Sequence, residues 1–136
     1  AYSLGNEFYW YDGTSSVQIT KDGAVKGDFG YFNYFRSGVA SYTIPSAASD
    51  SFINAWYTTA GTQTINLPVS STVSAGRFYA IKDGGGLAGT NAVTINAAGT
   101  DTIDGGTAGG SISIGTNYGH VLLVNTGLGQ WLRVQN

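Results

Sequence analysis

The chain has 136 residues, of which 42% are hydrophobic and only 10% charged, whereas about 25% of the residues of an average soluble domain are charged. Its single Glu and six Lys and Arg are too few to cover the outer faces of helices, and a net charge of −2 provides no basic stripe for nucleic acid and no polybasic patch for membranes. The length fits one domain, and the absence of Cys excludes disulfides, thiolate metal sites and Cys nucleophiles.

The first part of the chain is rich in aromatic residues. Residues 2–57 hold 14 of the 18 Phe, Tyr and Trp residues, with the densest runs at 8–11 and 29–36. If each run is a strand, its alternate residues face opposite sides. One face then belongs to the core, and the tyrosines of the other must be covered by another element, a neighbouring subunit or a ligand.

Period-two alternation predicts strands along the rest of the chain. The alternating pairs are Val17 and Ile19, Ile65 and Leu67, Val93 and Ile95, Ile112 and Ile114, and Leu132 and Val134. The runs 78–81 and 121–124 are continuously apolar and predict strands covered on both faces. This spacing predicts an all-β fold, an antiparallel β-sandwich, a jelly roll or a β-prism.

Half of the carboxylates are explained by turns. Asp-Gly pairs begin at Asp12, Asp22, Asp83 and Asp104, and such pairs favour tight hairpin turns. The remaining carboxylates are Glu7, Asp28, Asp50 and Asp101. Nothing in the sequence brings two of these together for glycoside hydrolysis, and His120 has no nucleophile motif to serve. We therefore expect no catalytic residue, no metal and no cofactor.

A set of blocks follows in order between residues 62 and 134. The blocks are Thr64-Ile65-Asn66-Leu67-Pro68, Gly76-Arg77-Phe78-Tyr79-Ala80-Ile81-Lys82-Asp83, Asn91-Ala92-Val93-Thr94-Ile95, Asp101-Thr102-Ile103-Asp104-Gly105, Tyr118-Gly119-His120-Val121 and Trp131-Leu132-Arg133-Val134. In order and spacing this set resembles the C-terminal segment of bacteriophage tail fibres and tailspikes. The resemblance implies an all-β domain, intertwined or packed as a homotrimer, at the host-facing tip of a fibre. It also agrees with the absence of Met, which suggests that residues 1–136 are one domain of a longer chain.

The expected function is recognition of a bacterial surface polysaccharide or lipopolysaccharide by an extracellular fibre tip of the virion. Aromatic rings stack on the apolar faces of sugars, and they are concentrated in residues 1–57, outside the matching segment 58–136. We expect the binding residues among Tyr9, Tyr11, Tyr31, Tyr34, Arg36 and Trp56.

Three alternatives stay open at this point. The domain could be a trimerisation cap that binds nothing, with its aromatic rings in the core or between subunits. It could also be a polysaccharide depolymerase whose carboxylates meet across subunits. A secreted sugar-binding module or adhesin domain has a similar composition. We expect neither nucleic-acid binding nor membrane insertion in any of these cases.

Overall fold

The chain forms β-strands throughout the part that the structure describes. The structure, a computed structural model, describes residues 2–4, 7–11, 16–19, 25–27, 33–46, 50–56 and 61–135, and the side chains of 36–46, 51–56 and 61–134. The described elements are strands and one turn of 3-10 helix, η1 (Ser70–Thr72), which confirms the predicted all-β class. Among these residues, no helix is long and apolar enough to cross a membrane.

The chain divides into two compact units, Ala1–Phe32 and Asn33–Asn136. The N-terminal unit holds a four-stranded antiparallel sheet whose strands pair in sequence order. They are β1 (Tyr2–Leu4), β2 (Glu7–Tyr11), β3 (Ser16–Ile19) and β4 (Val25–Gly27). From the sequence we expected one domain with a change of composition near residue 57. The contacts between residues divide the chain at Asn33.

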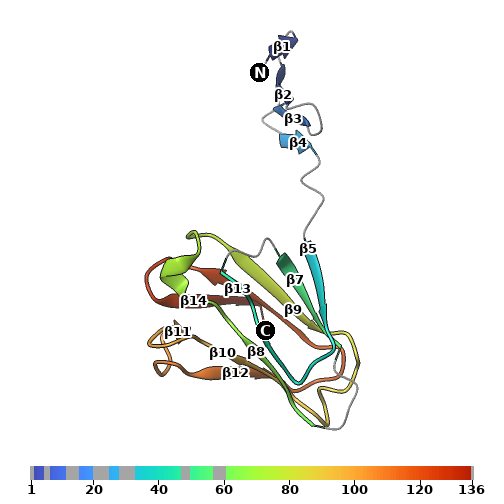
Figure 1. Cartoon of the computed structure of the whole chain (residues 1–136), viewed down its shortest axis with the longest axis vertical. Coiled ribbons are helices and arrows are strands. Elements are labelled where there is room, and N and C mark those ends of the chain that lie inside the picture. Colours follow the sequence, from blue (N-terminus) through green and yellow to red (C-terminus); the bar gives the residue numbers. More distant parts are fainter. Residues whose placement is uncertain are drawn as a thin grey trace. The chain divides into compact units, whose positions relative to one another are not determined.

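The C-terminal unit is a sandwich of two sheets that pack against each other (Figure 1). One sheet has six strands in the spatial order β11 (Thr102–Ile103), β14 (Gln130–Gln135), β13 (His120–Asn125), β9 (Phe78–Asp83), β7 (Asp50–Ala55) and β5 (Asn33–Ser37). The other has four strands in the order β12 (Ser111–Ile114), β10 (Val93–Asn96), β8 (Gln63–Asn66) and β6 (Ser41–Thr43).

Successive strands from β5 to β12 lie alternately in the two sheets. Because the chain crosses to the opposite sheet and back between β5 and β7, these two strands run in the same direction. The same path makes β7 and β9, β6 and β8, and β8 and β10 parallel neighbours. Strands β12, β13 and β14 then add antiparallel partners. The expected sandwich is confirmed, and its sheets are mixed rather than wholly antiparallel.

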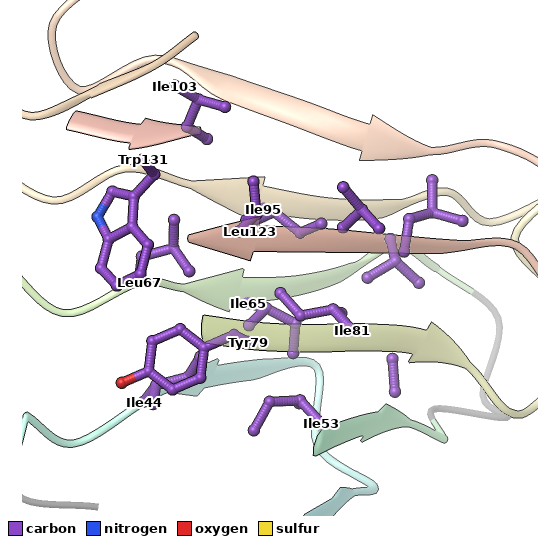
Figure 2. Packing of buried hydrophobic residues seen from close by; sticks show 14 of the residues in the cluster. Ile44, Ile53, Ile65, Leu67, Tyr79, Ile81, Ile95, Ile103, Leu123 and Trp131 are labelled. Atoms are coloured by element: carbon purple, nitrogen blue, oxygen red, sulfur yellow. The ribbon is translucent and has the colours of Figure 1, made fainter. Parts of the chain in front are cut away.

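The core lies between the two sheets and follows the alternation of the strands. Ile65 and Ile95 point inward from the four-stranded sheet toward Ile53, Ile81 and Leu123 of the six-stranded sheet (Figure 2). All five side chains are fully buried. Burial of one such side chain contributes about 1.5–3 kcal/mol, so this apolar layer is the main stabilising element of the unit.

Strand β14 buries the opposite face from the one that we expected. Trp131 is fully buried and packs against Tyr79 with the ring centroids 5.4 Å apart, whereas Leu132 and Val134 are 42% and 61% exposed. The alternation of Leu132 and Val134 predicted a strand with these two residues on its buried face; the strand forms, but these residues lie on its exposed face. Adjacent residues of a strand cannot share a face, so the large Trp131 ring, once inside, directs both aliphatic residues outward.

The Asp-Gly pairs have different structural roles. Asp104 and Gly105 have φ values of 51° and 70°, and the N–H of Gly106 donates to the carbonyl of Ile103 at 2.9 Å, so this pair forms a tight turn. The expected hairpin does not form, because the flanking strands β11 and β12 lie in different sheets. Asp83 instead ends β9, where the chain leaves for the opposite sheet, and no hairpin forms there. The Asp12 and Asp22 turns lie outside the described residues.

Candidate functional site

An exposed aromatic ring, Trp56, lies at the β5–β7 end of the six-stranded sheet. It follows β7 directly, and its backbone N–H donates to the carbonyl of Ser37 at 2.8 Å. The guanidinium carbon of Arg36, on β5, lies 4.3 Å from the centroid of the Trp56 ring. This exposed cation–π contact contributes about 0.5–1 kcal/mol. It fixes the orientation of a ring that remains 37% exposed.

Arg36 and Trp56 are the two predicted binding residues whose side chains are described, and the structure brings them together. Tyr9 and Tyr11 belong to β2 in the N-terminal unit, and Tyr34 belongs to β5. The side chains of these three tyrosines, and Tyr31 as a whole, lie outside the described residues. Their part in binding therefore stays a prediction.

Strand pairing extends Arg36 into a row of polar residues across four strands. Arg36 is opposite Asn54 of β7, and Asn54 is opposite Lys82 of β9. Lys82 is in turn opposite His120 of β13. Directly paired residues of neighbouring strands have their side chains on the same face of the sheet, about 4.5–5.5 Å apart at Cβ. These four residues, which we name the transverse row, therefore line up side by side.

The transverse row lies on the outer face of the six-stranded sheet. The next residues along three of its strands are Ile53, Ile81 and Val121, which are buried in the core between the sheets. Since consecutive residues of a strand face opposite sides, the row faces away from that core. Arg36 and His120 are exposed, Lys82 is half-buried, and Asn54 is buried.

A second exposed ring, Tyr118, lies beside Lys82. The ammonium of Lys82 donates to the backbone carbonyl of Tyr118 and lies 5.8 Å from the centroid of its ring. Tyr118 is 63% exposed, and its φ of 58° lies in the left-handed region that bulky residues rarely adopt. Strained backbone of this kind persists only where surrounding contacts enforce it, and it is concentrated at functional sites.

Asp83 supplies the contacts that hold this loop. Its buried carboxylate accepts hydrogen bonds from the backbone N–H groups of Gly86 at 3.0 Å, Ala88 at 2.9 Å and Tyr118 at 3.0 Å. One side chain therefore ties the loop after β9 to the loop before β13. Removing such buried, charge-assisted hydrogen bonds costs about 1.5–3 kcal/mol for each bond.

Two side chains of the transverse row are cationic. Arg36 and Lys82 are cationic, whereas the described carboxylates are engaged elsewhere. Asp83 binds backbone N–H groups, and Asp104 forms an ion pair with Arg133 at 3.0 Å. Among the residues whose side chains are described, no carboxylate belongs to the row. A chain with a net charge of −2 thus presents a local cationic strip.

An open hollow of about 310 Å³ adjoins the His120 end of the row. It is lined by apolar groups of β12 and by polar side chains that include Ser113, Thr116, His120 and Arg133. Its volume is at the lower end of the range for small-ligand pockets. His120 lines the hollow, but Val121 and Arg133, which is paired with the core residue Leu123, line it too, so the hollow opens on the side of the sheet opposite to the row.

The carboxylates considered for catalysis do not form a site in the part of the chain with described side chains. Asp101 is buried and accepts a hydrogen bond from the backbone N–H of Ser70 at 2.6 Å, which is a structural role. The side chains of Glu7 and Asp50, and Asp28 as a whole, lie outside the described residues. Within the described portion, no three His, Asp or Glu residues are grouped as metal ligands.

The end of this site at Arg36 and Trp56 was predicted from the sequence, and the end at Lys82 and His120 was not. Arg36 and Trp56 were found because aromatic residues are concentrated in the first part of the chain. Lys82 and His120 were assigned to strands, and their alignment depends on the strand pairing, which the sequence pattern does not encode. The tripeptide Asn117-Tyr118-Gly119 carried a turn signal that would have indicated an exposed tyrosine.

Comparison of the chain with models of protein families and with curated proteins gives no match. The functional assignment therefore depends on the geometry of this site and on the motifs in the sequence.

Proposed function

We propose that this chain binds a bacterial surface glycan, capsule or lipopolysaccharide, as the C-terminal part of a phage tail fibre or tailspike. The observation that carries glycan binding is the exposed Trp56 ring, held by Arg36 at 4.3 Å on a strand framework. The ordered motif blocks between residues 62 and 134 support the fibre context. In that context the protein acts outside the host cell, at the tip of the virion's fibre.

The chemistry of the site suits a sugar. A sugar has apolar faces of C–H groups and an equatorial rim of hydroxyls. The Trp56 ring offers a flat surface for the first at little cost in side-chain entropy, because a ring has only two rotatable bonds to fix. Arg36 and Lys82 offer N–H donors to the rim. Presentation on paired strands keeps both in place before binding, which reduces the entropic cost of association.

Replacement of Trp56 tests this proposal. Purified full chain is applied to a glycan array and to extracted host capsule and lipopolysaccharide. We expect wild-type binding and a loss of about fivefold or more in affinity for Trp56→Ala, since stacking contributes about 1 kcal/mol or more and about 1.4 kcal/mol corresponds to tenfold. Val69→Ala is the matched control, because Val69 is similarly exposed but lies near η1.

Two results would contradict the proposal. One is a wild-type chain that circular dichroism shows to be folded and that binds none of the glycans tested. The other is Trp56→Ala that binds as tightly as the wild type while Val69→Ala behaves in the same way.

The second candidate function is a trimerisation cap. It is favoured by a specific feature, the apolar outer face of the six-stranded sheet. Leu132 and Val134 are exposed there, and Val124 pairs directly with Leu132. Phe78 in turn pairs with Val124 on the same face. Contiguous exposed apolar side chains mark interaction surfaces. A trimer would also strengthen glycan binding, because three linked sites raise the effective concentration of each.

A further inference from the structure

We propose that the glycan bound at Trp56 is acidic, and that the transverse row recognises an oxyanion on the sugar, a carboxylate or a phosphate. This inference rests on the proposed glycan binding and names the class of ligand. It depends on the row of Arg36, Asn54, Lys82 and His120, which register places on one face of the sheet.

The row has the dimensions of an extended site. Neighbouring strands are about 4.8 Å apart, so the three intervals from Arg36 to His120 span roughly 14 Å. Trp56 lies at the first end, and Tyr118 lies beside Lys82 toward the other. A saccharide of several units that stacks on Trp56 would therefore run past Lys82 before it reaches His120.

The donors of the row suit an anion better than a neutral sugar. A guanidinium offers five N–H donors and an ammonium three, and neither has an acceptor. Lys82 uses one donor on the carbonyl of Tyr118 and keeps two. Neutral sugar hydroxyls are donors as well as acceptors, and sites for them need carboxylate or carbonyl acceptors. No carboxylate belongs to the row among the described side chains and the amide oxygen of Asn54 is buried, whereas an oxyanion needs donors alone.

The cationic charge of the row is available to a ligand. The ion pair of Arg133 with Asp104 shows that a cation and a carboxylate of this chain can neutralise each other. Lys82 is instead fixed by a neutral carbonyl, and Arg36 lies over a neutral ring. Both contacts orient the cation without cancelling its charge. An incoming oxyanion would therefore form charge-assisted hydrogen bonds, which are about twice as strong as neutral ones.

The test uses the full chain and three probes of matched length: oligogalacturonate, a phosphorylated mannan oligosaccharide and neutral dextran. Calorimetry should give at least tenfold tighter binding of one acidic probe than of dextran, and this advantage should decrease as salt is raised. The uronate and the phosphate arms distinguish the two sources of the anion.

Variants of two donors of the row, the Lys82 ammonium and the His120 ring, locate the effect. Lys82→Gln and His120→Gln should each weaken acidic binding by about tenfold or less, and together by more, and they should weaken dextran binding by a smaller factor. Arg133→Gln, which removes a positive charge that Asp104 already pairs with, is the matched control and should bind as the wild type.

The outcomes separate this inference from the proposed function. Trp56-dependent binding that is equal for acidic and neutral probes would overturn the acidic assignment and leave glycan binding in place. Acidic binding that Lys82→Gln and His120→Gln leave intact would also overturn it. A folded wild-type chain that binds none of the probes and no host glycan would overturn both.

Discussion

Tyr118 shows how a single residue is held in a costly conformation. Its φ of 58° is enforced on one side by the hydrogen bond from its N–H to Asp83. On the other side its ring lies against the backbone of Gly86, where a Cβ would come within 2.3 Å of the ring. A residue without a side chain is therefore required at position 86, because the ring occupies that space.

Gly86→Ala should lower the free energy of unfolding by about 1–3 kcal/mol and displace the Tyr118 ring. Gly99→Ala is the matched control, because Gly99 also has a positive φ, 56°, but open space around its Cβ position. Urea unfolding of both variants separates the backbone cost, which they share, from the clash, which is specific to Gly86. Equal destabilisation of the two would show that the ring does not occupy this space.

At the scale of the strands, the sequence pattern predicted existence better than placement. Strands β8, β10 and β12 coincide with the predicted alternating pairs, because a sheet with one buried face selects apolar residues at every second position. The pairing was not predictable in the same way. Apolar and polar residues alternate in the same way whether the next strand joins the same sheet or the opposite one. The sequence pattern therefore does not indicate which strands are parallel neighbours.

The candidate site was lost for the same reason. Arg36, Lys82 and His120 are 38 or more residues apart from one another in the chain, and only the register of β5, β7, β9 and β13 aligns them. In β14 the alternation predicted the strand but not its buried face. In Trp131-Leu132-Arg133-Val134 either Trp131 or the pair Leu132 and Val134 can face the core, and the large Trp131 side chain is the one that does.

The register of β14 can be measured. Trp131→Ala should cost about 3–5 kcal/mol of unfolding free energy, because it leaves a cavity in the core beside Tyr79. Val134→Ala should change it by about 0.5 kcal/mol or less, since Val134 is exposed. Denaturant unfolding at dilutions where the chain is monomeric gives both values. A larger loss of unfolding free energy for Val134→Ala than for Trp131→Ala would show that Val134, and not Trp131, faces the core.

For the whole molecule, the open question is how the outer face of the six-stranded sheet is covered. This face carries both the cationic transverse row and, further along the strands, the apolar group around Val124 and Leu132. A row that binds sugars must stay accessible, whereas exposed apolar residues gain free energy from burial, about 25 cal/mol for each Å². The two areas therefore favour different partners, a glycan and a second copy of the chain.

Sedimentation in solution tests the assembly. We expect the wild-type chain to have a mass near three times 14.1 kDa. The double variant Leu132→Thr, Val134→Thr should shift it toward the single-chain mass, because the exposed apolar surface is lost. Val39→Thr, at an exposed valine outside β14, should leave the trimer intact. A wild-type chain that sediments as one copy at micromolar concentration would contradict the trimer proposal.

Because successive strands alternate between the two sheets, the number of strands in the sandwich cannot change freely. Thr64-Ile65-Asn66 and Thr94-Ile95-Asn96 lie in register on β8 and β10, and the amide of Asn96 donates to Asn66 at 2.9 Å. Each circuit of the chain, from one sheet to the other and back, therefore adds one strand to each sheet. Insertion of a whole circuit would extend both ladders without disturbing the later strands. Insertion of a single strand would reverse the direction of everything after it, so this architecture grows only in even steps.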